Sequence, residues 1–438
     1  MSEKIDNLII GGGPAGLTAA NILRNLKKNY ILFESSDVLG GLCKTFKSND
    51  GFKFDNFKHI FKVSKDHLKE LQKIGIRTNF ETISTPRMLC GCENGKVHEY
   101  PVQENLWSLE PEERKLVLKS FSERARNIEI KTCKDWCLDK FGEYFSEKYI
   151  FPYIRKHLCS EPDEIGTKWL TMNNGKSRFS YPGEPDPKGK CGIENSYFEM
   201  FCYPMIGGFS SFFHQKHKEH LFTGNTLTKI DYKNKIAYFN NGKEFEYENL
   251  ISSVPLDEMI LKICDDVPDE LKEKARSLKY VSGDTVSIKM NFPVSRTDFH
   301  WMYVFDSSIK CAKVSAVSNI SKANVPNKRN GSIQLEYFRK PESKPITEDE
   351  VKADLKKLSE YNLFNNEYIQ SIEIRSEKYC NPILKDSDYD ISEFLCDWLS
   401  ERNITQIGRF GTWRYMLSPE VIISSKISTL KALNGNER

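Results

Sequence analysis

The pattern of hydrophobic and polar positions predicts alternating strands and helices at the start of the chain. The apolar run Leu8–Ile10 leads into a glycine-rich turn, and the stretch 17–23 that follows has the character of a helix. A second apolar run, Tyr30–Phe33, ends at Glu34. Strand, turn, helix and strand in this order predict a Rossmann-like α/β unit.

The same periodicities predict most of the remaining elements. Helical spacing is found at 67–75, across 108–158, at 346–361 and at 421–433. At the start of the third of these helices, Thr347 and Glu350 are spaced as a capping box. Alternation predicts one or two strands before Tyr100, a three-stranded meander over 225–247 and an antiparallel sheet over 281–374.

One polar stretch breaks this regularity. Between residues 173 and 195, glycines and prolines predict a long loop, either a lid from Gly175 to Gly192 or a domain linker.

Composition narrows the class of protein. The chain has 438 residues, too many for one core, so we expect two or three packing units. A net charge of +3 gives no basic excess for nucleic acid. No apolar run approaches the roughly 18 residues of a membrane span, and the start lacks the apolar segment of a signal peptide, so we expect a cytoplasmic protein. The 12 cysteines are irregularly spaced and predict free thiols, with no metal site.

The glycine-rich turn carries the pattern of a dinucleotide-binding site. Gly11-x-Gly13-x-x-Gly16 follows a predicted strand and opens a predicted helix. The glycines allow a tight turn, close approach of the backbone to a pyrophosphate, and close packing of helix on strand. The helix N-terminus then points its N–H groups at the phosphates. Glu34, at the end of the second strand, stands where a ribose-binding carboxylate belongs.

The segments after Glu34 resemble a known family. Gly40-Gly41-Leu42-Cys43-Lys44-Thr45, and then Gly51-Phe-Lys-Phe-Asp-Asn-Phe-Lys-His59, are similar to Gly-Gly-Leu-Ser-Arg-Thr and Gly-Phe-x-Phe-Asp-x-Gly-Gly-His. These segments occur in FAD-dependent flavoproteins of the UDP-galactopyranose mutase and amine oxidase superfamily, which includes protoporphyrinogen oxidase-like proteins. The resemblance implies FAD rather than NAD and makes His59 the flavin-proximal histidine, although a surface histidine is the simpler alternative.

Later segments extend the resemblance over nearly the whole chain. Residues 151–156, followed by Trp169, resemble the mutase element Pro-Tyr-Asn-x-Lys-x-Trp and its downstream tryptophan, although ordinary helix packing explains them about as well. Residues 201–212 resemble its Tyr-Pro-x-x-Gly-Gly turn. The run Gly408–Tyr415 is the most specific match, because it resembles the segment by which the family's last helix approaches the flavin. There Arg409 would add fixed positive charge beside a reduced flavin.

The resemblance implies a Rossmann-like FAD-binding domain with a helical insertion and an antiparallel β-sheet substrate domain. The FAD domain would comprise 1–75, 200–265 and 395–438, the insertion with its lid 101–199, and the substrate domain 76–100 and 266–394. The predicted catalytic residues are His59 and Arg409. The predicted cofactor-binding residues are Gly11, Gly13, Pro14, Ala15, Gly16, Glu34, Gly41, Leu42, Lys44, His59, Gly408, Arg409, Trp413 and Tyr415.

The substrate is less well defined than the cofactor. Two arginines clamp the substrate pyrophosphate in the mutase, and the corresponding positions fall near Asn173 and Lys313. The asparagine and tryptophan of the mutase element fall at Ile154 and Leu158. Four such changes predict an anionic sugar conjugate other than UDP-galactose, with Lys313 binding a phosphate. The predicted substrate residues are Tyr153, Lys156, Trp169, Tyr303 and Lys313.

Three functions remain open from the sequence. The first is a mutase-like enzyme that acts on a different activated sugar, with flavin N5 at the reacting centre. The second is a redox flavoenzyme, an oxidase, dehydrogenase or desaturase, whose N5 accepts hydride. The third is a flavoprotein scaffold without activity. No pattern in the sequence addresses the oligomeric state.

Overall fold

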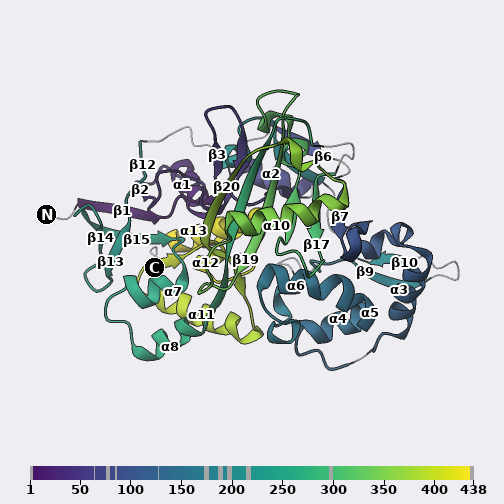
Figure 1. The fold of residues 1–438 in the computed structure, drawn as a ribbon. Coiled ribbons are helices and arrows are strands. Elements are labelled where there is room, and N and C mark those ends of the chain that lie inside the picture. The colour runs from purple at the N-terminus through teal and green to yellow at the C-terminus, as the bar shows by residue number, and fades with distance from the viewer. Residues whose placement is uncertain are drawn as a thin grey trace.

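The computed structural model describes residues 3–63, 65–74, 79–83, 86–126, 128–171, 177–185, 191–194, 200–213, 219–294 and 299–434. Figure 1 shows one large sheet at the side of the N-terminus, a second near the middle of the molecule, and a group of helices, α3 to α6, toward the opposite end.

The first sheet has seven strands in the order β12-β2-β1-β15-β14-β13, and β21 pairs with β15. Its strands are β1 (Glu3–Ile10), β2 (Tyr30–Phe33), β12 (Leu221–Phe222), β13 (Leu227–Asp231), β14 (Ile236–Phe239), β15 (Glu244–Ser252) and β21 (Ile404–Gln406). The pairs β12–β2, β2–β1, β1–β15 and β15–β21 are parallel. The strands β13, β14 and β15 form the predicted antiparallel meander. Three distant parts of the chain therefore build one Rossmann-like sheet.

Helices cover both faces of this sheet. On one face, α1 (Pro14–Asn25) and α13 (Ser418–Asn434) share a buried apolar cluster with β2 and β15. On the other face lie α7 (Leu256–Glu258), α8 (Asp269–Ser277) and α11 (Asp386–Ser400). Both β1 and β15 end in four consecutive buried residues, which is the pattern of strands that are covered on both faces.

The second sheet has the order β20-β16-β19-β18-β17-β7-β8. Its strands are β7 (Met88–Gly91), β8 (Val97–Glu99), β16 (Lys279–Met290), β17 (Trp301–Val304), β18 (Lys313–Ser315), β19 (Gly331–Arg339) and β20 (Ile369–Ile383). The prediction of an antiparallel sheet is correct except that β17 and β7 run parallel. Helix α10 (Glu348–Leu358) packs on this sheet, and the predicted capping box between Thr347 and Glu350 is confirmed.

The predicted helical insertion is present. It contains α3 (Pro111–Glu123), α4 (Cys133–Phe141), α5 (Glu143–Phe145), a π-helical turn (Ser146–Ile150) and α6 (Phe151–Leu158). Buried aromatic side chains pack between these helices. The ring centroid of Phe145 lies 5.0 Å from that of Phe121 and 5.3 Å from that of Phe141.

The prediction of a continuous long loop after the insertion is wrong in part. Strands β9 (Tyr181–Pro185) and β10 (Cys191–Glu194) pair as an antiparallel hairpin. Proline is tolerated there because the pair forms a sheet of only two strands, in which each strand has one unpaired edge. Asn173 and Gly175 lie outside the described residues.

Smaller elements complete the chain. They are β3 (Thr45–Lys47), β4 (Lys53–Asp55), β5 (Phe61–Val63), β6 (Phe80–Ile83), β11 (Met200–Pro204), α2 (Lys65–Lys73), α9 (Val317–Ile320) and α12 (Gly408–Gly411). Within the described part of the chain, no helix is long and apolar enough to cross a bilayer. Every cysteine whose side chain is described is a free thiol.

Candidate functional site

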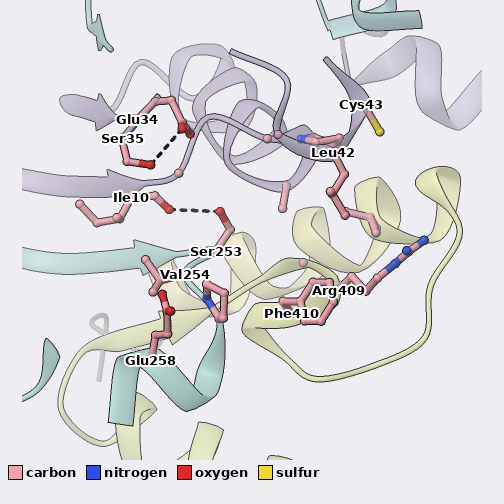
Figure 2. A pocket seen from close by; sticks show the side chains of 18 of the residues that line it. Ile10, Glu34, Ser35, Leu42, Cys43, Ser253, Val254, Glu258, Arg409 and Phe410 are labelled. Carbon is pink, nitrogen blue, oxygen red and sulfur yellow. Dashed lines mark hydrogen bonds between the residues drawn. The ribbon is translucent and has the colours of Figure 1, made fainter. Parts of the chain in front are cut away.

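A cavity of about 350 Å³ lies where the glycine-rich turn meets α12, and we call it the dinucleotide groove. Figure 2 shows its walls: Glu34 and Ser35 from the end of β2, Leu42 from the second glycine turn, Ser253 and Val254 after β15, and Arg409 from α12. The groove thus lies at the carboxyl ends of parallel strands, which is the usual ligand position in such sheets.

The local sequence explains the shape of the turn. Gly11 has a φ of +99°, and a Cβ placed there would lie 2.1 Å from the Oγ of Ser253. A Cβ on Gly16 would lie 1.9 Å from the carbonyl oxygen of Gly11. Side chains at either position would therefore push the turn away from its neighbours. Gly16 does not line the groove itself but lets α1 start close to the strand.

Glu34 is fixed at the rim of the groove. Its Oε2 accepts the backbone N–H of Gly12 at 2.6 Å, and its Oε1 accepts that of Ser36 at 2.8 Å. The side chain is buried but still lines the cavity. A carboxylate held in this way can accept ligand hydroxyl groups through its remaining lone pairs.

The groove opens toward a second cavity of about 200 Å³, which we call the substrate pocket. Leu42, His59, Arg409 and Ser418 line both cavities. Two of the residues that join the cavities, His59 and Arg409, are thus the two predicted catalytic residues, brought together from opposite ends of the chain.

His59 is half-buried and its ring is oriented by the backbone. Its Nε2 lies 2.7 Å from the carbonyl oxygen of Leu42 and 3.1 Å from that of Asn56, so this nitrogen donates. Its ring stacks on Phe209. Burial, with Arg409 and Lys313 nearby, lowers the pKa of His59 to about 4, so the ring is neutral at physiological pH.

Arg409 brings a fixed positive charge to the same junction. Its Nε and Nη2 donate to the carbonyl oxygen of Met416, at 2.9 and 2.5 Å. Its Nη1 donates to the carbonyl oxygen of Cys380 and the Oδ1 of Asn381. These acceptors are uncharged, so the charge of the guanidinium is not neutralised by them.

The substrate pocket is aromatic and cationic. Its aromatic walls are Phe57, Tyr153, Trp169, Tyr303, Phe338 and Tyr415. Its cationic side chains are Lys58, Lys62, Lys313 and Arg409, while Glu336 is the one carboxylate among the described residues that line it. Burial, with Lys313 and Arg178 nearby, lowers the pKa of Lys62 to about 8. A pocket of this charge favours an anionic ligand.

The structure brings most predicted residues to the two cavities. Those that line the dinucleotide groove are Gly11, Gly13, Pro14, Ala15, Glu34, Gly41, Leu42, His59, Gly408 and Arg409. Those that line the substrate pocket are Tyr153, Trp169, Tyr303, Lys313 and Tyr415. Tyr415, predicted to bind the cofactor, therefore lies on the substrate side.

Besides Gly16, three predicted residues line neither cavity. The Nζ of Lys44 pairs with Glu377 at 2.7 Å. The Nζ of Lys156 donates to the carbonyl oxygens of Asp306, Ile309 and Cys311, which ties α6 to the sheet. Trp413 is fully buried and packs edge-on against Phe410. These three side chains stabilise the fold: the two lysines through an ion pair or hydrogen bonds, and the tryptophan through apolar packing.

Sequence reasoning missed several residues of the substrate pocket. Lys58, Lys62 and His157 line it without having been predicted. A signal for Lys58 was present: it stands where the pattern Gly-Gly-His has its second glycine, so a long cation replaces a residue without a side chain. His157 lies at a variable position of the Pro-Tyr-Asn-x-Lys-x-Trp pattern.

Comparison with protein families supports the N-terminal assignment. Residues 9–73 match the model of the NAD(P)-binding Rossmann-like domain. Among curated proteins, the chain is 45% identical over 53 residues to the inactive all-trans-retinol 13,14-reductase of Danio rerio, covering 12% of this chain and 9% of that protein. It is 29% identical over 162 residues to the all-trans-retinol 13,14-reductase of Danio rerio, covering 36% of this chain and 22% of that protein. The chain thus matches only a small part of the length of these relatives.

Solved structures match over the whole chain. Reduced UDP-galactopyranose mutase matches with a TM-score of 0.87 and 22% identity, covering 98% of this chain and 96% of that one. A putative protoporphyrinogen oxidase from Exiguobacterium sp. 255-15 matches with a TM-score of 0.72 and 15% identity, covering 99% of both chains. The resemblance predicted from the sequence is therefore confirmed at the level of the fold, which this chain shares with both structures.

Proposed function

We propose that the chain is an FAD-dependent enzyme that acts on an anionic, activated sugar in the substrate pocket. The observation that carries this proposal is the junction of the two cavities at His59 and Arg409. A dinucleotide groove that opens into a cationic pocket places a cofactor and an anionic substrate side by side. The fold shared with UDP-galactopyranose mutase supports the choice of FAD.

The residues of the groove fit a dinucleotide. The first turn of α1 has N–H groups without intrahelical acceptors, and these face the phosphate position of the Rossmann motif. A Cβ on Gly13 would find its nearest neighbour, the Cα of Gly41, at 3.6 Å, so the two glycine turns pack closely and present backbone without side chains to the groove. Glu34 is placed to accept a ribose hydroxyl.

FAD, when bound, would supply a flavin whose N5 can act as a nucleophile or accept hydride. The protein would contribute orientation and charge. The neutral ring of His59, fixed by Leu42 and stacked on Phe209, closes one side of the junction without adding charge. Arg409 adds a fixed positive charge, which favours electron-rich species on or beside the flavin ring.

The substrate pocket favours an activated sugar over a hydrophobic substrate. Its aromatic walls suit the apolar face of a sugar ring, and its lysines suit a phosphoryl group. The position at which the mutase pattern has tryptophan carries Leu158, which lines the pocket, and the neighbouring Ile154 is buried in the core. We therefore infer a sugar conjugate bound differently from UDP-galactose.

A redox flavoenzyme is the second candidate. It is favoured by the relatives from Danio rerio, whose names describe reductases of retinol. Their similarity covers a small part of each protein, and the charge of the substrate pocket is unlike what an apolar substrate needs. For these reasons we place this function second.

One experiment separates the two candidates. The purified FAD-loaded protein is reduced with dithionite under anaerobic conditions and supplied with a panel of nucleotide sugars. The proposed function predicts isomerisation of one sugar by the reduced protein without net consumption of reductant. Bleaching of the oxidised flavin by a substrate in the absence of dithionite, followed by reoxidation in air, would instead establish the redox enzyme.

A further inference from the structure

Lys58 occupies an unusual position in the substrate pocket. Its side chain lies over the face of Trp301, with Nζ 3.3 Å from the ring centroid. Trp301 is fully buried on β17 and does not line the pocket, whereas Lys58 does. An aromatic face holds an ammonium group in place but does not neutralise its charge.

Two other cations of the substrate pocket, Lys313 and Arg409, have polar partners within the protein. Lys313 forms an ion pair with Oε2 of Glu336, and Oε1 of the same carboxylate accepts the backbone N–H of Lys58 at 2.6 Å. Glu336 therefore neutralises Lys313 and orients the backbone of Lys58. Among the described residues, no carboxylate pairs with Nζ of Lys58, and the donors of Arg409 are directed at Met416, Cys380 and Asn381.

We propose that Lys58 binds the phosphoryl group of the substrate in the pocket beside the dinucleotide groove. This inference rests on the proposed function and names the residue that binds the negatively charged group of the substrate. It replaces the prediction that Lys313 binds the phosphate, because Lys313 already has a buried carboxylate partner. The Lys58 ammonium offers three donors to a phosphoryl oxygen, and Lys62, on the neighbouring strand β5, adds to the positive potential.

The unfavourable electrostatics of the buried Lys58 ammonium support the binding of an anion beside it. Burial, with Lys313 and Lys62 nearby, lowers the pKa of Lys58 well below its ordinary value, while Glu336 opposes this effect. An anion placed against the ammonium would relieve both the desolvation and the repulsion between the lysines. A pocket with three lysines and one carboxylate is therefore a site that gains stability when an anion enters.

The test is calorimetric titration of the FAD-loaded protein with inorganic pyrophosphate, and separately with UDP, at pH 7 and low salt. Lys58→Met should weaken the binding of both probes at least about 10-fold, since a buried charge contact is lost. Lys58→Arg should restore binding to within about 3-fold of wild type, because the charge returns. Exposed Lys340, which lies outside the pocket, provides the matched control, and Lys340→Met should bind as wild type does.

A further comparison tests Lys313 directly. The double variant Lys313→Met with Glu336→Gln removes the ion pair without changing the net charge, so its loss of affinity should be smaller than that of Lys58→Met. Equal affinities of Lys58→Met and wild type, a double variant weaker than Lys58→Met, or no binding of either probe by wild type would each overturn the proposal. The titration measures binding and needs no turnover. If Lys58→Met weakens anion binding as expected but no sugar is isomerised, only the proposed function is refuted.

Discussion

Lys313 on β18 and Glu336 on β19 are registered partners on neighbouring strands, and their side chains form an ion pair at the wall of the substrate pocket. Both side chains are nearly excluded from water, with exposed fractions of 11% and 1%. A pair buried in this way depends on both members, because either charge alone would be left without compensation.

This relationship predicts an asymmetry between single and double variants. Lys313→Met should lower the free energy of unfolding by about 3–5 kcal/mol, because Glu336 would remain buried and unpaired. Adding Glu336→Gln should recover most of that loss. Urea unfolding of the three proteins measures the effect. Equal stability of the single variant and wild type would show that the pair is exposed in solution.

Alanine substitutions at Gly13 and Gly16 should have different effects, one on FAD binding and the other on stability. Gly16→Ala should destabilise the fold, since its Cβ would lie 1.9 Å from the carbonyl oxygen of Gly11. Gly13 has a φ of −77°, which alanine adopts readily, and a Cβ there would make only ordinary contact with Gly41, at 3.6 Å. Gly13→Ala should therefore fold normally and lose FAD affinity, because its methyl group occupies the space for the cofactor. Thermal unfolding and FAD titration separate the two outcomes, and unchanged FAD affinity in Gly13→Ala would contradict the assignment of the groove.

Glu34→Ala tests the ribose end of the groove. Removing a carboxylate that accepts a ribose hydroxyl should weaken FAD binding by about 1.5–3 kcal/mol. Because Glu34 also accepts the N–H groups of Gly12 and Ser36, the stability of the cofactor-free variant has to be measured as well. Ser36→Ala serves as the control, since its hydroxyl does not line the groove and donates to the carbonyl oxygen of Val38. If both variants bind FAD as wild type does, Glu34 has no role in binding.

The buried histidine of α6 predicts a pH dependence of stability. Burial, followed by the charge of Lys313, lowers the pKa of His157 to about 3. Between this value and its ordinary pKa of about 6.5, the unfolded chain binds a proton that the folded chain does not, so stability is lost as the pH falls. Wild type should therefore lose roughly 2 kcal/mol or more relative to His157→Phe between pH 7 and pH 4. Parallel pH profiles of the two proteins would mean that His157 is accessible to protons in the folded state.

Local motifs explain what the sequence could predict. The succession of strand, glycine turn, helix and strand at the start of the chain follows from a contiguous pattern, and the structure has these elements. The capping box of α10 and the meander are also short-range features. Their physics is contained in a few neighbouring residues, so no knowledge of the rest of the chain is needed.

Partners that are distant in the sequence explain what could not be predicted. Lys44 forms an ion pair with Glu377, and Lys156 donates hydrogen bonds to carbonyl oxygens of the 306–311 loop. No pattern in the sequence near either lysine indicates these contacts. The pairing of Lys313 with Glu336 likewise depends on the register of β18 with β19. The role of Lys58 emerges only when Trp301, from another strand, is placed beneath it.

The cofactor content of the purified protein tests the central claim most directly. Protein expressed without added cofactor is denatured, and the released small molecules are separated by chromatography against FAD, FMN and NAD standards. The account predicts about one FAD per chain for wild type and strongly reduced FAD for Gly13→Ala, whose far-UV circular dichroism should match that of wild type. A folded wild-type protein that is colourless and takes up neither FAD nor FMN in a titration would contradict it.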